Sequence, residues 1–211
     1  MAGLPGASAP IPAAYFAFRG LFEQTFLKDL FRPDFSNGHR FDAVEYIDHL
    51  VSPLPADPAN AVSALEIKAY MHNQLLRDSD AMSMAHSLEL RVPLIDHPLV
   101  ELVAAIPSAS KKPASDRNKD LLLKALPAEL PEECWKRTKH TFTLPFAHWL
   151  KKELRNEAEA VLVSGESPLR RVCQPEALQR IWEGFLADRV HWSRVWLAVV
   201  FARWSQQLSI K

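Results

Sequence analysis

The chain has 211 residues, of which 48% are hydrophobic, and its 25 Lys and Arg residues are balanced by 25 Asp and Glu residues. This is enough apolar chain for the core of one domain, or of two small ones, and zero net charge argues against the basic face that nucleic-acid binding needs. The stretch from Met1 to Phe16 lacks the basic and apolar regions of a signal peptide, and no apolar run is long enough to cross a bilayer. We expect a cytoplasmic globular protein with neither nucleic acid nor membrane as partner.

Apolar residues recur at helical spacing between the 16 prolines, which is typical of an all-helical domain. Asp57 lies one residue before Pro58, and Asp96 lies two residues before Pro98, each at the start of such a run. An aspartate at this place, with a proline in the first helical turn, is typical of an N-cap. The predicted helices are Tyr15–Phe31, Phe41–Val51, a helix opening at Pro58, a helix from Asp96 to Pro107, Asn118–Leu126, Leu144–Val163, Pro175–Ala187 and Val190–Leu208.

The fold class predicted is therefore all-α, with residues 1–13 as a flexible N-terminal segment and residues 14–211 as one helical domain. Two helices should bury a stripe at helical spacing, and the last helix, apolar almost all round, should be the most buried. In the helix that opens at Pro58 the stripe consists of Val62, Leu65, Ala69 and Leu76. In the helix from Asp96 to Pro107 it consists of Leu99, Val100, Val103 and Ala104.

One segment, Leu88–Pro93, is predicted to be extended, because Pro93 keeps Val92 out of the helical region. Neighbours in an extended chain point to opposite sides, so Glu89 and Arg91 should lie together on a cavity wall. From the residue types alone, such a pair is most often structural.

Other polar residues of the stretch Leu76–Val103 also favour structural roles. Asp80 and Asp96 are expected to cap helices, and His86 to be a hydrogen-bonded core histidine. Cys134 and Cys173 have no disulfide or zinc spacing, and the eight histidines show no HExxH motif. No metal site is predicted.

Three segments resemble one family. The longest, "LRDSDAMSMAHSLELRVPLIDHPLVE", closely resembles the C-terminal part of the synthetase domain of glutamine-hydrolysing asparagine synthases, including its Glu-x-Arg-x-Pro motif. The segments "WKRTKHTFTLPFAHWL" and "HWSRVWLAVVFARW" resemble later parts of the same domain. The resemblance implies the helical part of a PP-loop (adenine-nucleotide α-hydrolase-like) synthetase domain, whose α/β layer is absent from this chain.

The resemblance also implies a ligase that uses ATP and Mg²⁺ to adenylate the side chain of aspartate, which ammonia from glutamine then converts to asparagine. By position, Lys139 matches the lysine at the α-phosphate and pyrophosphate, where a cation stabilises developing charge. Glu89 matches the motif's carboxylate, which would position the nucleophile or accept a proton. Arg91, Asp80 and Ser83 are the expected substrate-binding residues.

The chain departs from the family pattern at three places. It has no Ser-Gly-Gly-x-Asp-Ser phosphate loop, its second residue is Ala2 where the glutaminase nucleophile is a cysteine, and Thr141 stands two residues after Lys139 where a glycine is common. We therefore expect the chain alone to be inactive and not to bind ATP productively. A large exposed apolar face should then promote self-association or docking on a partner that carries the phosphate loop.

Three other functions stay open. A related carboxylate-adenylating enzyme, such as a β-lactam-forming synthetase, would share the same helices. A non-catalytic interaction module would share the exposed apolar face. A helix-turn-helix regulator fits least well, because the chain has no net positive charge.

Overall fold

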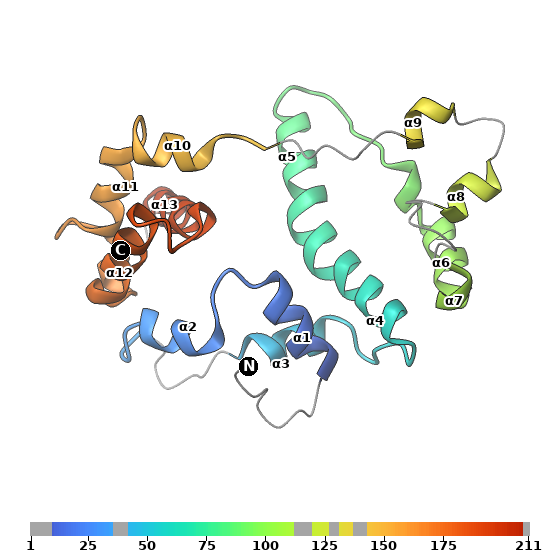
Figure 1. Cartoon of the computed structure of the whole chain (residues 1–211), viewed down its shortest axis with the longest axis horizontal. Coiled ribbons are helices and arrows are strands. Elements are labelled where there is room, and N and C mark those ends of the chain that lie inside the picture. The colour runs from blue at the N-terminus through green and yellow to red at the C-terminus, as the bar shows by residue number, and fades with distance from the viewer. Residues whose placement is uncertain (1–9, 36–41, 112–119, 127–130, 137–142, 209–211) are drawn as a thin grey trace. The chain divides into compact units, whose positions relative to one another are not determined.

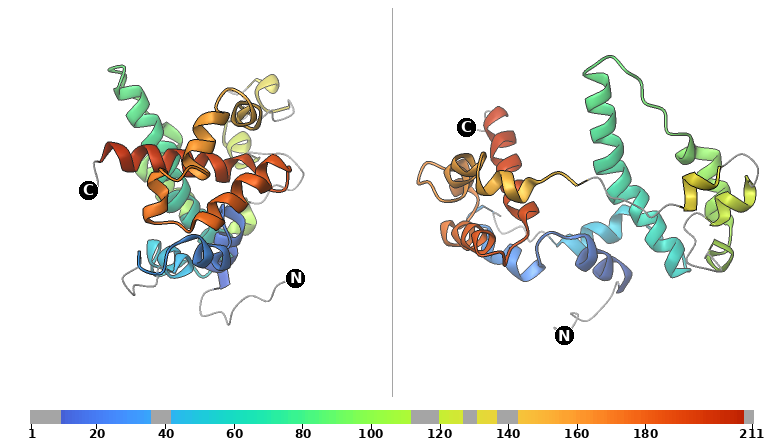
Figure 2. Two further views of the ribbon diagram at one scale, coloured as in Figure 1. Left: turned by 90° about the vertical axis from the view of Figure 1, so that its left-hand side faces the viewer. Right: turned by 45° about the horizontal axis from the view of Figure 1, so that its top comes forward.

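The computed structural model describes residues 10–35, 42–111, 120–126, 131–136 and 143–208. Within these ranges the chain forms helices and no named strand, which confirms the all-α prediction (Figures 1 and 2). A single bridge between Phe31 and Cys173 is the only β-type pairing seen there. None of the helices in the described ranges has both the length and the apolar character to span a membrane.

The helices follow one another along the chain with few long connections. They are α1 (Pro10–Arg19), α2 (Gln24–Leu30), α3 (Ala43–Leu50), α4 (Pro58–Leu65), η1 (Glu66–Leu76), α5 (Arg77–Met84), η2 (Pro93–Ile95), α6 (His97–Ala105), α7 (Ser108–Lys111), α8 (Asp120–Ala125), α9 (Glu132–Lys136), α10 (Phe146–Lys151), α11 (Arg155–Leu162), η3 (Pro168–Arg171), α12 (Pro175–Leu186) and α13 (Trp192–Gln207).

The described residues form two compact units. One takes its described residues from within the ranges Met1–Tyr15 and Val44–Thr141, and the other from within Phe16–Ala43 and Phe142–Lys211. The boundary at residue 13 between a flexible segment and one helical domain stays a prediction.

The first unit is built on a continuous helical rod made of α4, η1 and α5 (Figure 1). The rod begins as predicted, with Pro58 in its first turn and Asp57 as N-cap, whose carboxylate accepts a hydrogen bond from the N–H of Asn60 at 3.0 Å. Its middle part, η1, is π-helical. The N-cap thus fixes where the rod starts, since it satisfies a donor that the helix itself cannot.

The predicted buried stripes of this unit are mostly wrong. Leu65 is fully buried, but Val62 is exposed, and η1, α5, η2 and α6 contain no buried residue. Leu99, Val100 and Val103 are half-buried and Ala104 is exposed. A helix buries its apolar stripe only where another element packs on it, and no described element covers these faces closely enough to exclude water.

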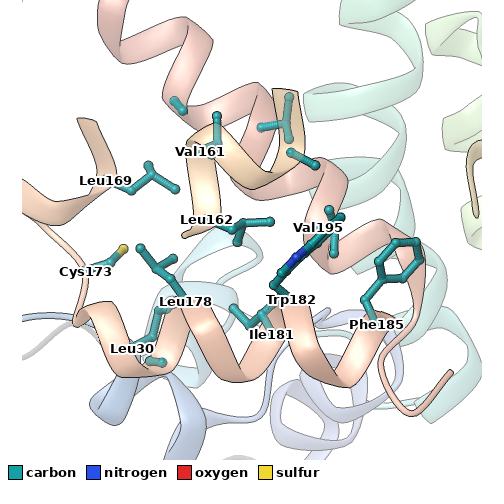
Figure 3. Packing of buried hydrophobic residues seen from close by; sticks show 14 of the residues in the cluster. Leu30, Val161, Leu162, Leu169, Cys173, Leu178, Ile181, Trp182, Phe185 and Val195 are labelled. Carbon is teal, nitrogen blue, oxygen red and sulfur yellow. The ribbon is translucent and has the colours of Figure 1, made fainter. Parts of the chain in front are cut away.

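The second unit has a dense apolar core between α10, α11, α12 and α13 (Figure 3). Helix α12 contributes more buried residues than any other described helix, so the prediction that the last helix is the most buried is wrong. On α13 only Val195, Val199 and Ala202 are buried. Its opposite side is apolar but exposed, which the sequence pattern alone does not distinguish from a buried side.

Two predicted helices are each divided in two. The first divides between α1 and α2, where the N–H of Gly20 donates to the carbonyl of Phe16 at 2.7 Å, and a Cβ at residue 20 would collide with that oxygen. The second divides between α10 and α11, where the N–H of Leu154 donates to the carbonyl of Trp149 at 2.7 Å. This second break lets Leu150 of α10 and Leu162 of α11 enter one core.

Candidate functional site at the end of α5

Asp80 and Ser83 lie in the last two turns of α5, so the helix continues beyond the point where Asp80 was expected to cap an end. The hydroxyl of Ser83 donates to the main-chain carbonyl of Asp80 at 3.2 Å. The carbonyl of Ser83 then accepts hydrogen bonds from the N–H groups of His86 and Leu88, both at 3.0 Å. These bonds, with Ser87 at a φ of 58°, end the helix and turn the chain into the extended segment.

Glu89 and Arg91 lie side by side, as the alternation of an extended chain predicts. Nε of Arg91 donates to Oε1 of Glu89 at 3.1 Å, and both side chains are well exposed. An exposed pair of this kind contributes only about 0–1 kcal/mol to stability, so the fold does not depend on keeping these two charges together. Both remain available to a ligand.

Two nearby residues differ from expectation. His86 is exposed, so the prediction of a core histidine is wrong, because none of the described elements covers the turn that carries it. Asp96 occupies the N-cap position of α6, as predicted, but its side chain makes no capping hydrogen bond. The sequence therefore predicted the position of the N-cap residue correctly, but not that its carboxylate leaves the helix N–H groups without a capping hydrogen bond.

Six large apolar side chains around the pair are exposed. We call them the 82–94 apolar face; they are Met82, Met84, Leu88, Leu90, Val92 and Leu94. The stretch Leu76–Val103, which by composition should belong to a core, contains no buried residue. The alternation of Leu88, Leu90 and Val92 is the sequence signal for this face, and it marks a surface with one apolar side.

Lys139 lies outside the described residues, as do His140 and Thr141, so Lys139 is not placed relative to Glu89. The structure describes the chain on both sides of it. Lys136 pairs with Glu132 at 2.6 Å at the end of α9. On the other side Phe146, the first residue of α10, is held within a cluster of tryptophans.

This aromatic cluster belongs to the second unit. The Phe146 ring stacks on Trp192 and meets Trp196, with both centroid distances at 4.8 Å, and it meets Trp149 edge-on at 5.4 Å. Aromatic contacts of this kind add about 0.5–1.5 kcal/mol each beyond simple burial. They fix the start of α10, seven residues after Lys139.

In the described ranges, no group of three or more His, Cys, Asp or Glu side chains is placed to hold a metal ion. Cys173 is a free, buried thiol in the core of the second unit. Burial raises the pKa of this thiol to about 11, because the low-dielectric core disfavours the thiolate. It is therefore a structural cysteine.

Residues 10–206 match the pattern of the asparagine synthase family over nearly the whole chain. The chain belongs to the asparagine synthase family. It is 27% identical over 200 residues to glutamine-hydrolysing asparagine synthetase 1 of Bacillus subtilis (strain 168), covering 92% of this chain and 30% of that protein. It is 40% identical over 96 residues to asparagine synthetase 3 of the same organism, covering 42% of this chain and 15% of that protein. No solved structure matches the chain significantly.

Membership in this family agrees with the resemblance seen in the three sequence segments and with the helical fold. The chain spans less than a third of the length of the curated relatives it matches. Family membership therefore identifies the chain as a part of an asparagine synthase-type protein.

Proposed function

We propose that this chain supplies the helical wall of an amide-forming synthetase site that converts aspartate to asparagine. The observation that carries the proposal is the match to the asparagine synthase family over residues 10–206, within which Glu89 and Arg91 form an exposed pair. In the complete reaction a carboxylate oxygen of the aspartate side chain attacks the α-phosphorus of ATP, and pyrophosphate leaves. Ammonia then attacks the acyl carbon, AMP leaves, and a proton is lost.

Within this scheme Lys139 contacts the α-phosphate and pyrophosphate, where its positive charge offsets the charge that develops on the phosphate oxygens. Glu89 orients the ammonia nucleophile or accepts its proton. Arg91, Asp80 and Ser83 bind substrate around it. The support for these roles is the match of positions, together with the exposure of Glu89 and Arg91.

The chain does not carry out the reaction alone in this proposal. Its sequence has no glycine-rich phosphate loop, and the described residues offer no metal-binding cluster for Mg²⁺. The phosphate loop, the magnesium ligands and the source of ammonia then come from the part of the enzyme outside the 30% of its length that this chain matches.

Two assays test the proposal. The isolated chain, given ATP, aspartate and Mg²⁺, should show no exchange of pyrophosphate into ATP, and clear exchange would contradict its inactivity. A hybrid enzyme, in which this chain replaces the 200 matching residues of the Bacillus subtilis synthetase 1, should form asparagine.

Variants of the hybrid separate catalysis from folding. Lys139→Ala and Glu89→Gln should each lower kcat/KM by about 10²–10³-fold. Lys136→Ala, which removes a nearby lysine that pairs with Glu132 and lies over the Trp135 ring, should change it less than about twofold. Equal losses in all three variants, or a hybrid that forms a β-lactam in place of asparagine, would contradict the assigned site and substrate.

A further inference from the structure

Ser87 has a main-chain conformation that few residues other than glycine adopt. Its φ is 58°, and among the described residues only Asp188 shares a positive φ without being a glycine. The left-handed region brings the Cβ of an L-residue too close to the following carbonyl oxygen, so such a residue persists only where the surrounding structure requires it. The conformation of Ser87 is therefore imposed by the structure around it.

Two main-chain hydrogen bonds impose this conformation. The N–H of Ser87 donates to the carbonyl of Met84 at 2.9 Å, and the N–H of Leu88 donates to the carbonyl of Ser83 at 3.0 Å. This pair of bonds, closed around a left-handed residue, is the Schellman motif that ends many helices, and glycine is the usual residue at its left-handed position. The motif stops α5 and sets the direction in which the following residues leave it (Figures 1 and 2).

The residues that follow this motif carry the candidate site. Glu89 lies two residues after Ser87, and its carboxylate pairs with Arg91 at 3.1 Å. The far end of the extended segment is held as well, because the carbonyl of Val92 accepts from the N–H of Ile95 at 3.1 Å. Two residues of extended chain span about 7 Å, so a rotation at Ser87 displaces Glu89 over a lever of that length.

We infer that Ser87 is a positioning residue for the proposed amide-forming site: its left-handed conformation, and not its hydroxyl group, holds Glu89 and Arg91 in place for the substrate. The inference rests on the proposed function, because Ser87 acts only through these two residues. A displacement of about 1 Å in a site can cost an enzyme about 10²-fold in rate. A residue at position 87 that resists the left-handed region should therefore lower activity, although no group that takes part in the reaction is removed.

Substitutions at position 87 of the hybrid enzyme separate the main-chain conformation from the side chain. Ser87→Gly and Ser87→Ala both remove the hydroxyl, but glycine enters the left-handed region freely, alanine at a cost, and the β-branched valine with most difficulty. Ser87→Gly should keep kcat/KM within about twofold of the parent, because glycine adopts the same conformation. Ser87→Val should lower kcat by about 10–100-fold, with Ser87→Ala between the two. Equally slow glycine and alanine variants would show that the hydroxyl itself acts, and would overturn the inference.

A double-variant cycle tests whether Ser87 acts through Glu89. In a Glu89→Gln background the carboxylate is already absent, so adding Ser87→Val should lower kcat by less than about threefold more. The same fold-loss in both backgrounds, or equal kinetics of Ser87→Gly and Ser87→Val, would contradict this inference alone. A hybrid whose activity does not depend on Glu89 would instead contradict the proposed function, and this inference with it.

The end of α12 offers a matched control. Asp188 lies in the second unit and is none of the residues assigned to the site, but it has a φ of 56° and closes the same pair of bonds. Its N–H donates to the carbonyl of Phe185 at 3.0 Å, and the N–H of Arg189 donates to the carbonyl of Gly184 at 2.8 Å. The two motifs therefore make the same demand on one residue at two places in the chain.

Variants of this second motif separate positioning from stability. Asp188→Gly and Asp188→Val both remove the carboxylate that pairs with Lys151, so they differ in the cost of the left-handed region. In the full chain, each valine variant, at position 87 or 188, should unfold at a lower urea concentration than the glycine variant at the same position. In the hybrid, kcat should differ by less than about twofold between Asp188→Gly and Asp188→Val. Loss of kcat at both motifs alike would mean general destabilisation, and equal urea midpoints for Ser87→Gly and Ser87→Val would mean that residue 87 is not left-handed; either result overturns the inference.

Discussion

The hydroxyl of Ser108 donates a hydrogen bond of 2.5 Å to Oδ2 of Asp57, which lies 51 residues earlier in the chain. The other carboxylate oxygen accepts from the N–H of Asn60, and Nζ of Lys111 donates to the side-chain oxygen of Asn60 at 2.5 Å. One side chain therefore caps α4 and also ties its start to α7. In a unit with few buried residues, this polar connection supports the arrangement that an apolar core usually provides.

The connection makes the stability of the first unit depend on pH. The Ser108 hydroxyl, and then the N–H of Asn60, hold the pKa of Asp57 below its ordinary value of 3.8. A lowered carboxyl pKa contributes stability that is complete above the ordinary value and is lost as pH falls through the lowered one. Asp57→Asn should be less stable than the parent in urea at pH 7, and this deficit should shrink below about pH 4.

The matched control for this experiment is Asp78→Asn, which changes an exposed carboxylate on α5. It should unfold like the parent at both pH values, as seen by circular dichroism. A deficit of Asp57→Asn that is the same at pH 3 and pH 7 would show that its carboxylate charge does not contribute.

A glycine in α12 sets how closely the next segment approaches. A Cβ at residue 184 would lie 2.5 Å from Cγ2 of Val190, and the carbonyl of Gly184 accepts from the N–H groups of Arg189 and Val190. Gly184→Ala should therefore destabilise the chain by about 1–3 kcal/mol through overpacking. Gly165→Ala, where a Cβ would meet nothing within 4 Å, serves as the control.

The same contact can be tested by compensation. Val190→Ala removes the colliding methyl groups, so the double variant G184A/V190A should be more stable than the sum of the two single changes predicts. Simple additivity in denaturant unfolding would mean that the cost of Gly184→Ala arises elsewhere.

The core of the second unit gives the largest expected loss of stability. Phe185 is 2% exposed and lies within the apolar core of α12 (Figure 3). Phe185→Ala should cost about 3–5 kcal/mol, because it removes apolar contacts and leaves a cavity. Phe18→Ala, at a ring that is 82% exposed, should change stability by less than about 0.5 kcal/mol. Similar midpoints for the two variants in denaturant would contradict this core.

The sequence predicted the local features of this chain better than it predicted which side chains are buried. The N-cap at Asp57, the amphipathic α12 and the Glu89–Arg91 pair follow from neighbouring residues, and the structure confirms them. The breaks after α1 and α10 were missed, since no proline marks either one. Helical spacing predicted buried stripes on α4 and α6, but spacing shows only which face is apolar and not whether anything covers it.

The candidate site was likewise predicted only where local backbone geometry decides the arrangement. An extended chain between a turn and a proline was enough to predict that Glu89 and Arg91 share a side, because this rests on backbone geometry alone. The exposure of His86 and of the 82–94 apolar face depends on which elements pack there, which the sequence of one chain does not specify. The role proposed for Lys139 follows from its position in the segment that resembles the family, because residue 139 lies outside the described residues.

The last prediction concerns the thiol of Cys173. It is buried where the bridge between Phe31 and Cys173 joins the end of α2 to the start of α12, and the carbonyl of Leu30 accepts from the N–H of Gln174 at 2.8 Å. With a pKa of about 11, only about one thiol in a thousand is a thiolate at pH 8, and only the thiolate reacts.

In a Cys134→Ser background, reaction with a disulfide reagent should be slow in buffer and complete in seconds to minutes in denaturant. The reaction rate in buffer should follow the unfolding equilibrium, so Phe185→Ala should accelerate it and Phe18→Ala should not. Fast reaction in buffer without either change would mean that this junction opens on its own and that the second unit is less firmly closed around α2.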